Sequence, residues 1–144
     1  MGVDPGRLLP TEDPPAGTFQ AIFQALEASS RPLVGPAQPR LLVIPIHGND
    51  GLVAGGLWGC TMFEWMQVQM LFVPEGLRQR GLGSALMAAA ETEARRRGCR
   101  GCHVDAFSFQ AASFYGKLGY RRFGVLEDFP PGHRRLFVFK RLDS

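Results

Sequence analysis

Apolar residues follow two different spacings along this chain, and the changes between them predict where helices and strands lie. Near the N-terminus, four apolar side chains recur at the i, i+3, i+4, i+7 spacing of an amphipathic helix: Phe19, Ile22, Phe23 and Leu26. This helix is predicted to begin at Asp13-Pro14, because aspartate caps a first turn and proline fits one. Residues 1–13 are expected to form an irregular arm, and the prolines and glycine of residues 29–39 predict a loop.

Strand-like patterns follow this loop. Residues 40–47 and 52–59 flank the turn Gly48-Asn-Asp-Gly51 and predict a hairpin, and Pro45 places the first strand at an edge or a bulge. Residues 65–73 predict a third strand. Its Gln67 and Gln69 alternate with apolar neighbours, which indicates either a wet groove beside the following loop or a plain edge strand.

The second half of the chain alternates between helix and strand. We predict a helix over residues 81–97, with Glu91 and Glu93 on its solvent face, and a strand over residues 102–107. The order strand, helix, strand implies that the two strands pair in parallel. A short helix over residues 111–118 and a final antiparallel pair, residues 120–126 and 135–141, complete a mixed α/β pattern.

Length and composition restrict the class of protein. At 144 residues the chain fits one domain, residues 1–144, which is large enough to bury about two thirds of its unfolded surface. The hydrophobic content of 45% is ordinary for a globular protein, and no apolar run approaches the roughly 18 residues of a membrane span. Since the N-terminus has no apolar signal core, we expect a cytoplasmic protein that does not bind membranes.

The cysteines and arginines do not indicate a metal site or a nucleic-acid site. Cys99 and Cys102 form a Cys-x-x-Cys, but Gly98 ends the helix before it, whereas a redox motif opens a helix. No second ligand pair lies at zinc spacing, so we expect buried or edge thiols and no metal. The net charge of +3 comes from arginine clusters that lack the stacked aromatics of RNA-binding modules, so we expect no nucleic-acid partner.

The stretch that follows the third strand carries the clearest chemistry. It passes from the strand end through a basic turn into a helix of small residues. Arg78 and Arg80 add positive charge beside the unpaired N–H groups of a helix N-terminus, and Gly81 and Gly83 let an anion approach the backbone. The turn therefore predicts a pyrophosphate site.

Two common phosphate motifs are excluded here. The dinucleotide-binding turn is shorter and needs a third glycine where this chain has Leu86, and no Gly-Lys-Ser/Thr follows as in a P-loop. The remaining pattern, Arg-x-x-Gly-x-Gly (Arg78, Gly81, Gly83), resembles the acetyl-CoA loop of the GNAT superfamily of N-acetyltransferases. A second stretch, Ala111-Ala-Ser-Phe-Tyr-Gly-Lys-Leu-Gly-Tyr120, resembles the other GNAT signature in the right order and separation.

The resemblance covers residues 65–126 and implies both fold and cofactor. The implied fold is α/β (α+β), the GNAT acyl-CoA N-acyltransferase fold, with a mixed central sheet splayed between two parallel strands and helices on both faces. Phe107–Ala111 and Pro130–His133 add similarity to bacterial members whose acceptor is unassigned. The co-substrate would be acetyl-CoA, with these implied contacts: Leu71, Phe72, Val73, Arg78, Gln79, Arg80, Gly81, Leu82, Gly83, Ser84 and Ser108.

The resemblance also implies an activity, transfer of acetyl to a primary amine of a small molecule or peptide by direct attack in a ternary complex. Tyr115 occupies the position of the acid that protonates the leaving thiolate, although a buried tyrosine can also be purely structural. Ser108 stands where many members have asparagine, and Gln69 stands where some have glutamate; an amide cannot take a proton. The base is therefore open among Glu64, Glu75, Asp105, His133 and water, and the alternative is an amine that arrives already neutral and needs no base.

Two expectations remain. The alternative to an acetyltransferase is a noncatalytic acyl-CoA-binding module, which would keep the phosphate loop without needing the Tyr115 hydroxyl. We also expect a homodimer, because phenylalanines crowd the C-terminal third and the terminal strands of this fold often pair between subunits: Phe109, Phe129, Phe137 and Phe139.

Overall fold

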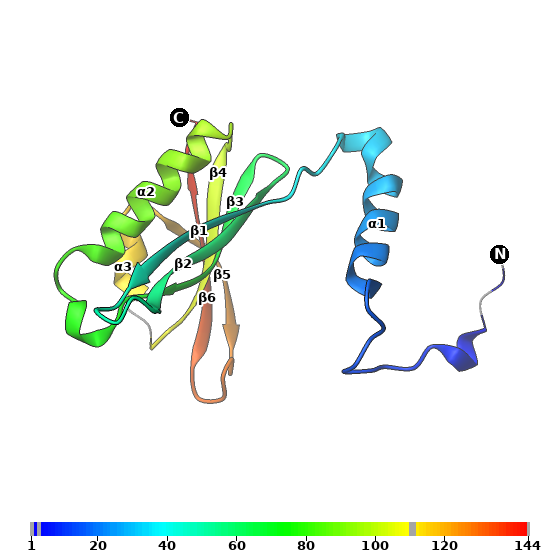
Figure 1. The fold of residues 1–144 in the computed structure, drawn as a ribbon, viewed down its shortest axis with the longest axis horizontal. Coiled ribbons are helices and arrows are strands. Elements are labelled where there is room, and N and C mark those ends of the chain that lie inside the picture. The colour runs from blue at the N-terminus through cyan, green and yellow to red at the C-terminus, as the bar shows by residue number, and fades with distance from the viewer. Residues whose placement is uncertain (1, 3, 110–111, 144) are drawn as a thin grey trace. The chain divides into compact units, whose positions relative to one another are not determined.

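The structure, a computed structural model, describes residues 2, 4–109 and 112–143. The chain divides into two compact units, Met1–Ala37 and Gln38–Ser144. The first unit contains a short 3₁₀ helix, η1 (Pro5–Arg7), and the helix α1 (Thr18–Val34), coloured blue in Figure 1. In the described part of the chain, no helix is long and apolar enough to cross a membrane.

The amphipathic helix is confirmed as α1, but its predicted bounds are wrong at both ends. Asp13 does not cap it; Gly17 precedes the first turn with φ 87°, and the Thr18 hydroxyl donates to the Pro15 carbonyl at 2.6 Å. The helix then continues through Pro32 to Val34, into the predicted loop. Pro32 has no N–H to donate to the preceding turn, and the helix ends two residues later. Gly35 N–H closes the last turn on the Arg31 carbonyl at 2.8 Å.

The second unit contains the sheet. Its elements, in chain order, are β1 (Arg40–His47), β2 (Val53–Met62), β3 (Trp65–Phe72), η2 (Glu75–Leu77), α2 (Leu82–Arg96), β4 (Gly101–Phe107), α3 (Ala112–Lys117), β5 (Arg121–Glu127) and β6 (Arg134–Arg141). The predicted strands and helices of this half are confirmed to within a few residues; Ala111, the predicted start of α3, lies outside the described residues.

The six strands form one mixed sheet in the order β1-β2-β3-β4-β6-β5. All neighbours are antiparallel except β3 and β4, which are parallel as predicted. Pro45 lies in the edge strand β1, where a missing N–H costs no ladder hydrogen bond, and this prediction is also confirmed.

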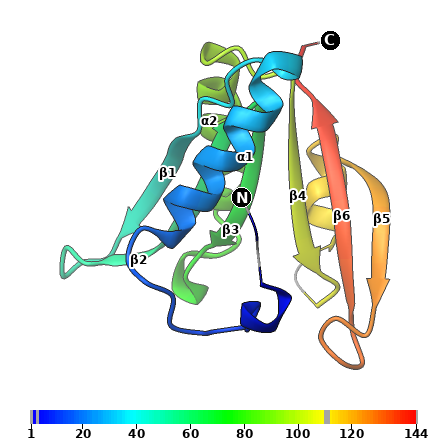
Figure 2. The same ribbon diagram turned by 90° about the vertical axis from the view of Figure 1, so that its right-hand side faces the viewer.

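The parallel pair separates after four residue pairs. Pairing runs from Trp65 opposite Gly101 to Val68 opposite Val104 and stops there, although β3 continues to Phe72 and β4 to Phe107. Figure 2 shows the two strands diverging beyond this point. The splay that the family resemblance implied is therefore present.

A β-bulge lies in β3 at the start of the splay. Trp58 of β2 pairs with Met70 and the next residue, Gly59, pairs with Val68, so Gln69 is the extra residue. A bulge reverses the side-chain alternation. Val68 before it and Leu71 after it consequently both pack with the core, although they are three residues apart.

The helix α2 packs against β1, β2 and β3 through one apolar stripe: Leu86, Met87, Ala90 and Ala94. The predicted solvent position of Glu91 is wrong, because its side chain is buried. Its carboxylate accepts hydrogen bonds from the Tyr120 hydroxyl and from Lys140 Nζ, each at 2.9 Å. Helical periodicity cannot reveal such a site, since the two donors come from distant parts of the chain.

The cysteines agree with the expectation of buried or edge thiols. Cys60, Cys99 and Cys102 are all free, and the last two are buried. Burial raises the pKa of the Cys102 thiol to about 12, so this thiol stays protonated at neutral pH and is a poor nucleophile or ligand.

We expect Glu91→Ala to destabilise the protein by about 2–3 kcal/mol, because it leaves the buried Tyr120 hydroxyl without its acceptor and Lys140 without its counter-ion. The measurement is the midpoint of urea unfolding. The matched control is Glu93→Ala on the same helix, which removes an exposed ion pair to Arg96 and a partly buried one to Arg97 but leaves no fully buried group unpaired, and it should shift the midpoint less. Equal shifts for the two variants would contradict the structural role given to Glu91.

Candidate functional site

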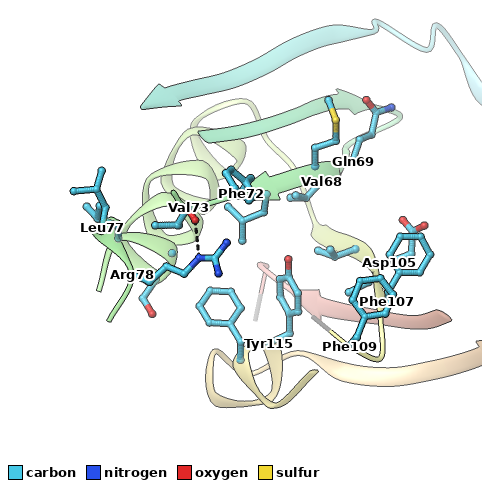
Figure 3. A pocket seen from close by; sticks show the side chains of 18 of the residues that line it. Val68, Gln69, Phe72, Val73, Leu77, Arg78, Asp105, Phe107, Phe109 and Tyr115 are labelled. Carbon is cyan, nitrogen blue, oxygen red and sulfur yellow. Dashed lines mark hydrogen bonds between the residues drawn. The ribbon is translucent and has the colours of Figure 1, made fainter. Parts of the chain in front are cut away.

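A cavity of about 950 Å³ opens where β3 and β4 diverge. Its walls are the separated strand ends, the loop between β3 and α2, the first turn of α2 and the helix α3. In Figure 3, Leu77 and Arg78 lie at one end of this cavity, Asp105, Phe107 and Phe109 lie at the other, and Tyr115 lies between them. The loop and the second predicted motif therefore meet in one site.

Most of the predicted cofactor contacts line this cavity. They come from the end of β3, the loop and the start of α2: Leu71, Phe72, Val73, Arg78, Gln79, Gly81, Leu82, Gly83 and Ser84. Arg80 and Ser108 are not part of the lining. Ser108 instead joins β4 to β6, with its N–H donating to the Arg134 carbonyl at 2.7 Å and its Oγ accepting from the Arg134 N–H at 3.0 Å.

Arg78 holds the end of the strand. Its Nε donates to the Val73 carbonyl at 2.9 Å, shown as the dashed line in Figure 3, and its guanidinium lies 5.4 Å from the centre of the Phe72 ring. Two contacts thus fix a positive charge at this end of the cavity. The arrangement favours an anion at the N-terminus of α2, where the helix dipole has the same sign.

The two glycines of the loop are needed for different reasons. Gly81 precedes α2 with φ 76°, a conformation that side-chain-bearing residues rarely adopt. A Cβ on Gly83 would lie 3.2 Å from two ring carbons of Phe114, so the absence of a side chain lets α3 approach α2. The sequence explained Gly83 by the access of a phosphate to the backbone. The structure adds a second reason, which is close packing against Phe114.

Tyr115 is buried at the centre of the site. Its ring contacts Phe114 and Tyr120 edge to face, at centroid distances of 5.0 and 5.8 Å. Its hydroxyl is directed into the cavity (Figure 3) and forms no hydrogen bond with any residue of the described ranges. Chiefly burial, and then the nearby Cys102 and Asp105, raise the pKa of Tyr115 to about 12. The site thus contains a neutral donor with no protein partner in those ranges.

The side chains on the two faces of β4 line different sides of the cavity. Val104 and Ala106 belong to the core cluster that includes Tyr115. Because side chains alternate along a strand, Asp105 and Phe107 face the opposite side of the sheet. The cavity, which all four of these residues line, thus passes through the sheet at the splay.

The candidate bases are widely separated. Glu64 lies in the turn between β2 and β3 and pairs with Arg100 at 2.6 Å, Glu75 lies in η2, and His133 lies between β5 and β6. Only Asp105, of these four, lines the cavity. Gln69, the bulged residue, lines it from the other strand, whereas Gln67 does not. Because β3 lies inside the sheet, the interpretation of the glutamines as a plain edge strand is wrong.

Sequence reasoning missed an ion pair in the site. Arg135 of β6 donates from Nε to Asp105 Oδ2 at 2.6 Å and from Nη2 to the same oxygen. It reaches there because β6 pairs with β4, placing Arg135 opposite Phe107 and beside Asp105. Period-two alternation does place Asp105 and Phe107 on one face, but the identity of the neighbouring strand is a tertiary feature.

Comparison with known proteins agrees with this geometry. Residues 41–122 match the model of the acetyltransferase (GNAT) domain. An Agrobacterium fabrum acetyltransferase is 38% identical over 85% of this chain and 89% of its own length. The blasticidin-S acetyltransferase of Streptomyces morookaense is 40% identical over 82% of this chain and 88% of its own length.

A solved structure extends the agreement to three dimensions. An acetyltransferase from Bacillus cereus superposes with a TM-score of 0.77 at 31% identity, covering 92% of this chain and 97% of that one. The sequence matches and the splayed sheet together show that this chain belongs to the GNAT family of acetyltransferases.

Proposed function

We propose that this protein transfers an acetyl group from acetyl-CoA to the primary amine of a small molecule, by direct attack in a ternary complex. The observation that carries the proposal is the Tyr115 hydroxyl, which has no hydrogen bond to the described residues and lies in the cavity between the anion-binding loop and Asp105. A module that only bound acyl-CoA would not need a free donor at this point. The relative that is a blasticidin-S acetyltransferase supports a small-molecule acceptor over a peptide.

The donor would occupy the α2 side of the cavity. Its diphosphate lies on the N–H groups at the start of α2 beside Arg78, and its pantetheine arm follows Leu71–Val73 along the separated edge of β3. The thioester then reaches the splay near Tyr115. Acetyl-CoA supplies the activated acyl group, and no cluster of histidine, cysteine and acidic residues that could hold a metal occurs in residues 2, 4–109 and 112–143.

The acceptor would enter from the opposite face of the sheet. Asp105 is the carboxylate that lines this side, and its Oδ1 receives no hydrogen bond from any residue in the described part of the chain. We infer that Oδ1 accepts a hydrogen bond from the incoming amine and orients its lone pair toward the thioester carbon. Glu64, Glu75 and His133 lie outside the cavity lining, which favours Asp105 over them for this step.

The reaction balances without a further reagent. The amine nitrogen attacks the thioester carbon and forms the C–N bond, and the C–S bond then breaks. The nitrogen loses one proton to Asp105 or to water, and the coenzyme A sulfur leaves as a thiolate that accepts a hydrogen bond from the Tyr115 hydroxyl and then takes one proton from solvent. The products are the N-acetylated amine and coenzyme A.

The high pKa of Tyr115 limits what this hydroxyl can contribute. A thiol with an ordinary pKa of about 8.5 is a stronger acid than a tyrosine of pKa about 12, and so full proton transfer to a free thiolate is uphill by about 5 kcal/mol. The hydroxyl therefore acts mainly by hydrogen bonding to the charge that develops on sulfur while the C–S bond breaks.

Coenzyme A at 100 times its dissociation constant should stabilise the protein by about 2.7 kcal/mol, which raises the melting temperature by roughly 10 °C. Ser84→Glu should remove most of this shift. Its carboxylate favours the N-terminus of α2 in the free protein but repels a diphosphate there. Ala88→Glu, on an exposed position of the same helix outside the cavity, is the control and should keep the shift. An undiminished shift in melting temperature for Ser84→Glu would contradict the proposed position of the diphosphate at this loop.

Tyr115→Phe should lower kcat about 100-fold, as expected for the loss of one hydrogen-bond donor to the charge that develops on sulfur, with little effect on coenzyme A affinity. The control is Tyr120→Phe, which removes the other tyrosine hydroxyl of the pair but lies outside the cavity lining, and should cost stability and not turnover. The turnover of both variants is measured by the release of the coenzyme A thiol during acetylation. Full turnover by Tyr115→Phe would make Tyr115 a packing residue.

The pH profile of the wild type should rise as the acceptor amine loses its proton and then stay level to about pH 11, because a tyrosine of pKa about 12 remains protonated over this range. A tyrosine of ordinary pKa would instead produce a decline near pH 10. The rate of acetylation against pH, with the fold checked by circular dichroism at each value, distinguishes the two. A decline centred near pH 10 would contradict the buried environment assigned to this hydroxyl.

A further inference from the structure

Four rings gather where β4 ends and the β5–β6 loop returns. Phe107 stacks on Phe109 at a centroid distance of 5.2 Å and an angle of 9°, and it contacts Phe129 at 5.9 Å. His133 meets Phe109 edge to face at 5.0 Å. We call Phe107, Phe109, Phe129 and His133 the aromatic shelf. Two of its members belong to the loop, which is closed by a hydrogen bond from the Phe129 N–H to the His133 carbonyl at 3.2 Å.

A planar cation already rests on this shelf. The guanidinium of Arg135 lies 4.8 Å from the centre of the Phe107 ring and 4.7 Å from that of Phe129, and it is hydrogen bonded to Asp105. Two rings and a carboxylate thus fix the arginine in place. The positive charge of Arg135 cancels the negative charge of Asp105, so the ion pair beside the shelf has no net charge.

The shelf leaves both an apolar and a polar surface open to a ligand. Phe109 lines the cavity and is 57% exposed, although Phe107 covers one of its faces. Beside it, Arg135 Nη1 donates no hydrogen bond to the described residues, and Asp105 Oδ1 accepts none from them. A flat ring can therefore stack here while a donor and an acceptor at its edge are satisfied.

The shelf lies on the side of the cavity that the acceptor would use. Asp105 and Phe107 face away from the core cluster that contains Tyr115, and Figure 3 shows Phe107 and Phe109 at the end remote from Leu77 and Arg78. A molecule stacked on Phe109 would thus lie near the splay without entering the space of the diphosphate.

The geometry points to an acceptor that carries its primary amine on a short arm attached to a flat aromatic or heteroaromatic ring, which stacks on Phe109. This assignment rests on the proposed acetyltransferase function and names its substrate class. A polyamine gains little from the shelf, because Arg135 neutralises the carboxylate that would attract it and an alkyl chain cannot stack. The flat ring, and not the positive charge, is what the site recognises.

The test compares two acceptors with the same two-carbon arm, 2-phenylethylamine and 2-cyclohexylethylamine. The cyclohexyl ring has the larger apolar surface, so simple hydrophobic burial favours it, whereas stacking favours the phenyl ring. We expect kcat/KM with acetyl-CoA to be about 3- to 10-fold higher for 2-phenylethylamine in the wild type, since an aromatic pair adds a factor of about 2 to 12 beyond its area burial. Phe109→Leu should reduce the ratio of the two values to near one, and Phe109→Tyr should restore it.

Phe123→Leu is the matched control. Phe123 of β5 is exposed to the same degree, 58%, but does not line the cavity, so this variant should keep the wild-type ratio. A wild-type ratio near one, or an unchanged ratio in Phe109→Leu, would overturn the assignment while leaving the acetyltransferase function intact.

If neither amine is turned over, a binding measurement tests the ring-binding role of the shelf separately from the acetyltransferase activity. Calorimetric titration of each amine into the protein saturated with coenzyme A gives a ratio of dissociation constants. A preference for 2-phenylethylamine that Phe109→Leu removes would support the shelf as a ring-binding site even though neither amine was an acceptor. Equal dissociation constants would overturn the shelf assignment as well.

Discussion

The structure of the site depends on one constraint, which is that β3 and β4 stop pairing after Val68 and Val104. Backbone N–H and C=O groups that leave a ladder need other partners, because burying them unpaired is costly. In this protein the separated strand ends border a cavity, and the amides of a pantetheine arm are groups that could take the place of the missing strand. The same break opens a cavity within a sheet that is otherwise continuous.

Because side chains alternate along β4, the two sides of this opening carry different residues. Val104 and Ala106 face Tyr115 and the core, while Asp105 and Phe107 face Arg135 across the neighbouring strand. The bulge at Gln69 has the matching effect on β3, because it returns Leu71 to the core side after the break. In the proposed reaction, donor and acceptor therefore approach from opposite faces of the sheet.

The buried carboxylate of Glu91 links α2 to the strands on the other side of the splay. It accepts hydrogen bonds from Tyr120 and Lys140, and the ring of Tyr120 contacts that of Tyr115. At the N-terminal end of the same helix, Gly83 allows Phe114 of α3 to approach closely. These contacts fix the distance between the start of α2 and the Tyr115 hydroxyl, which in the proposed complex is spanned by the pantetheine arm.

The sequence by itself determined the local elements and the chemistry of the loop. Period-two alternation located the strands, the apolar stripe and Gly98 located α2, and Arg78, Gly81 and Gly83 indicated an anion site, because each of these signals lies within one short stretch of chain. The tertiary structure alone decided that Glu91 is buried, that Asp105 pairs with Arg135, and that Asp105 is the candidate base that lines the cavity. These features join residues roughly 30 to 50 positions apart, whose partners depend on the order of strands in the sheet, and no periodicity within a single segment encodes that order.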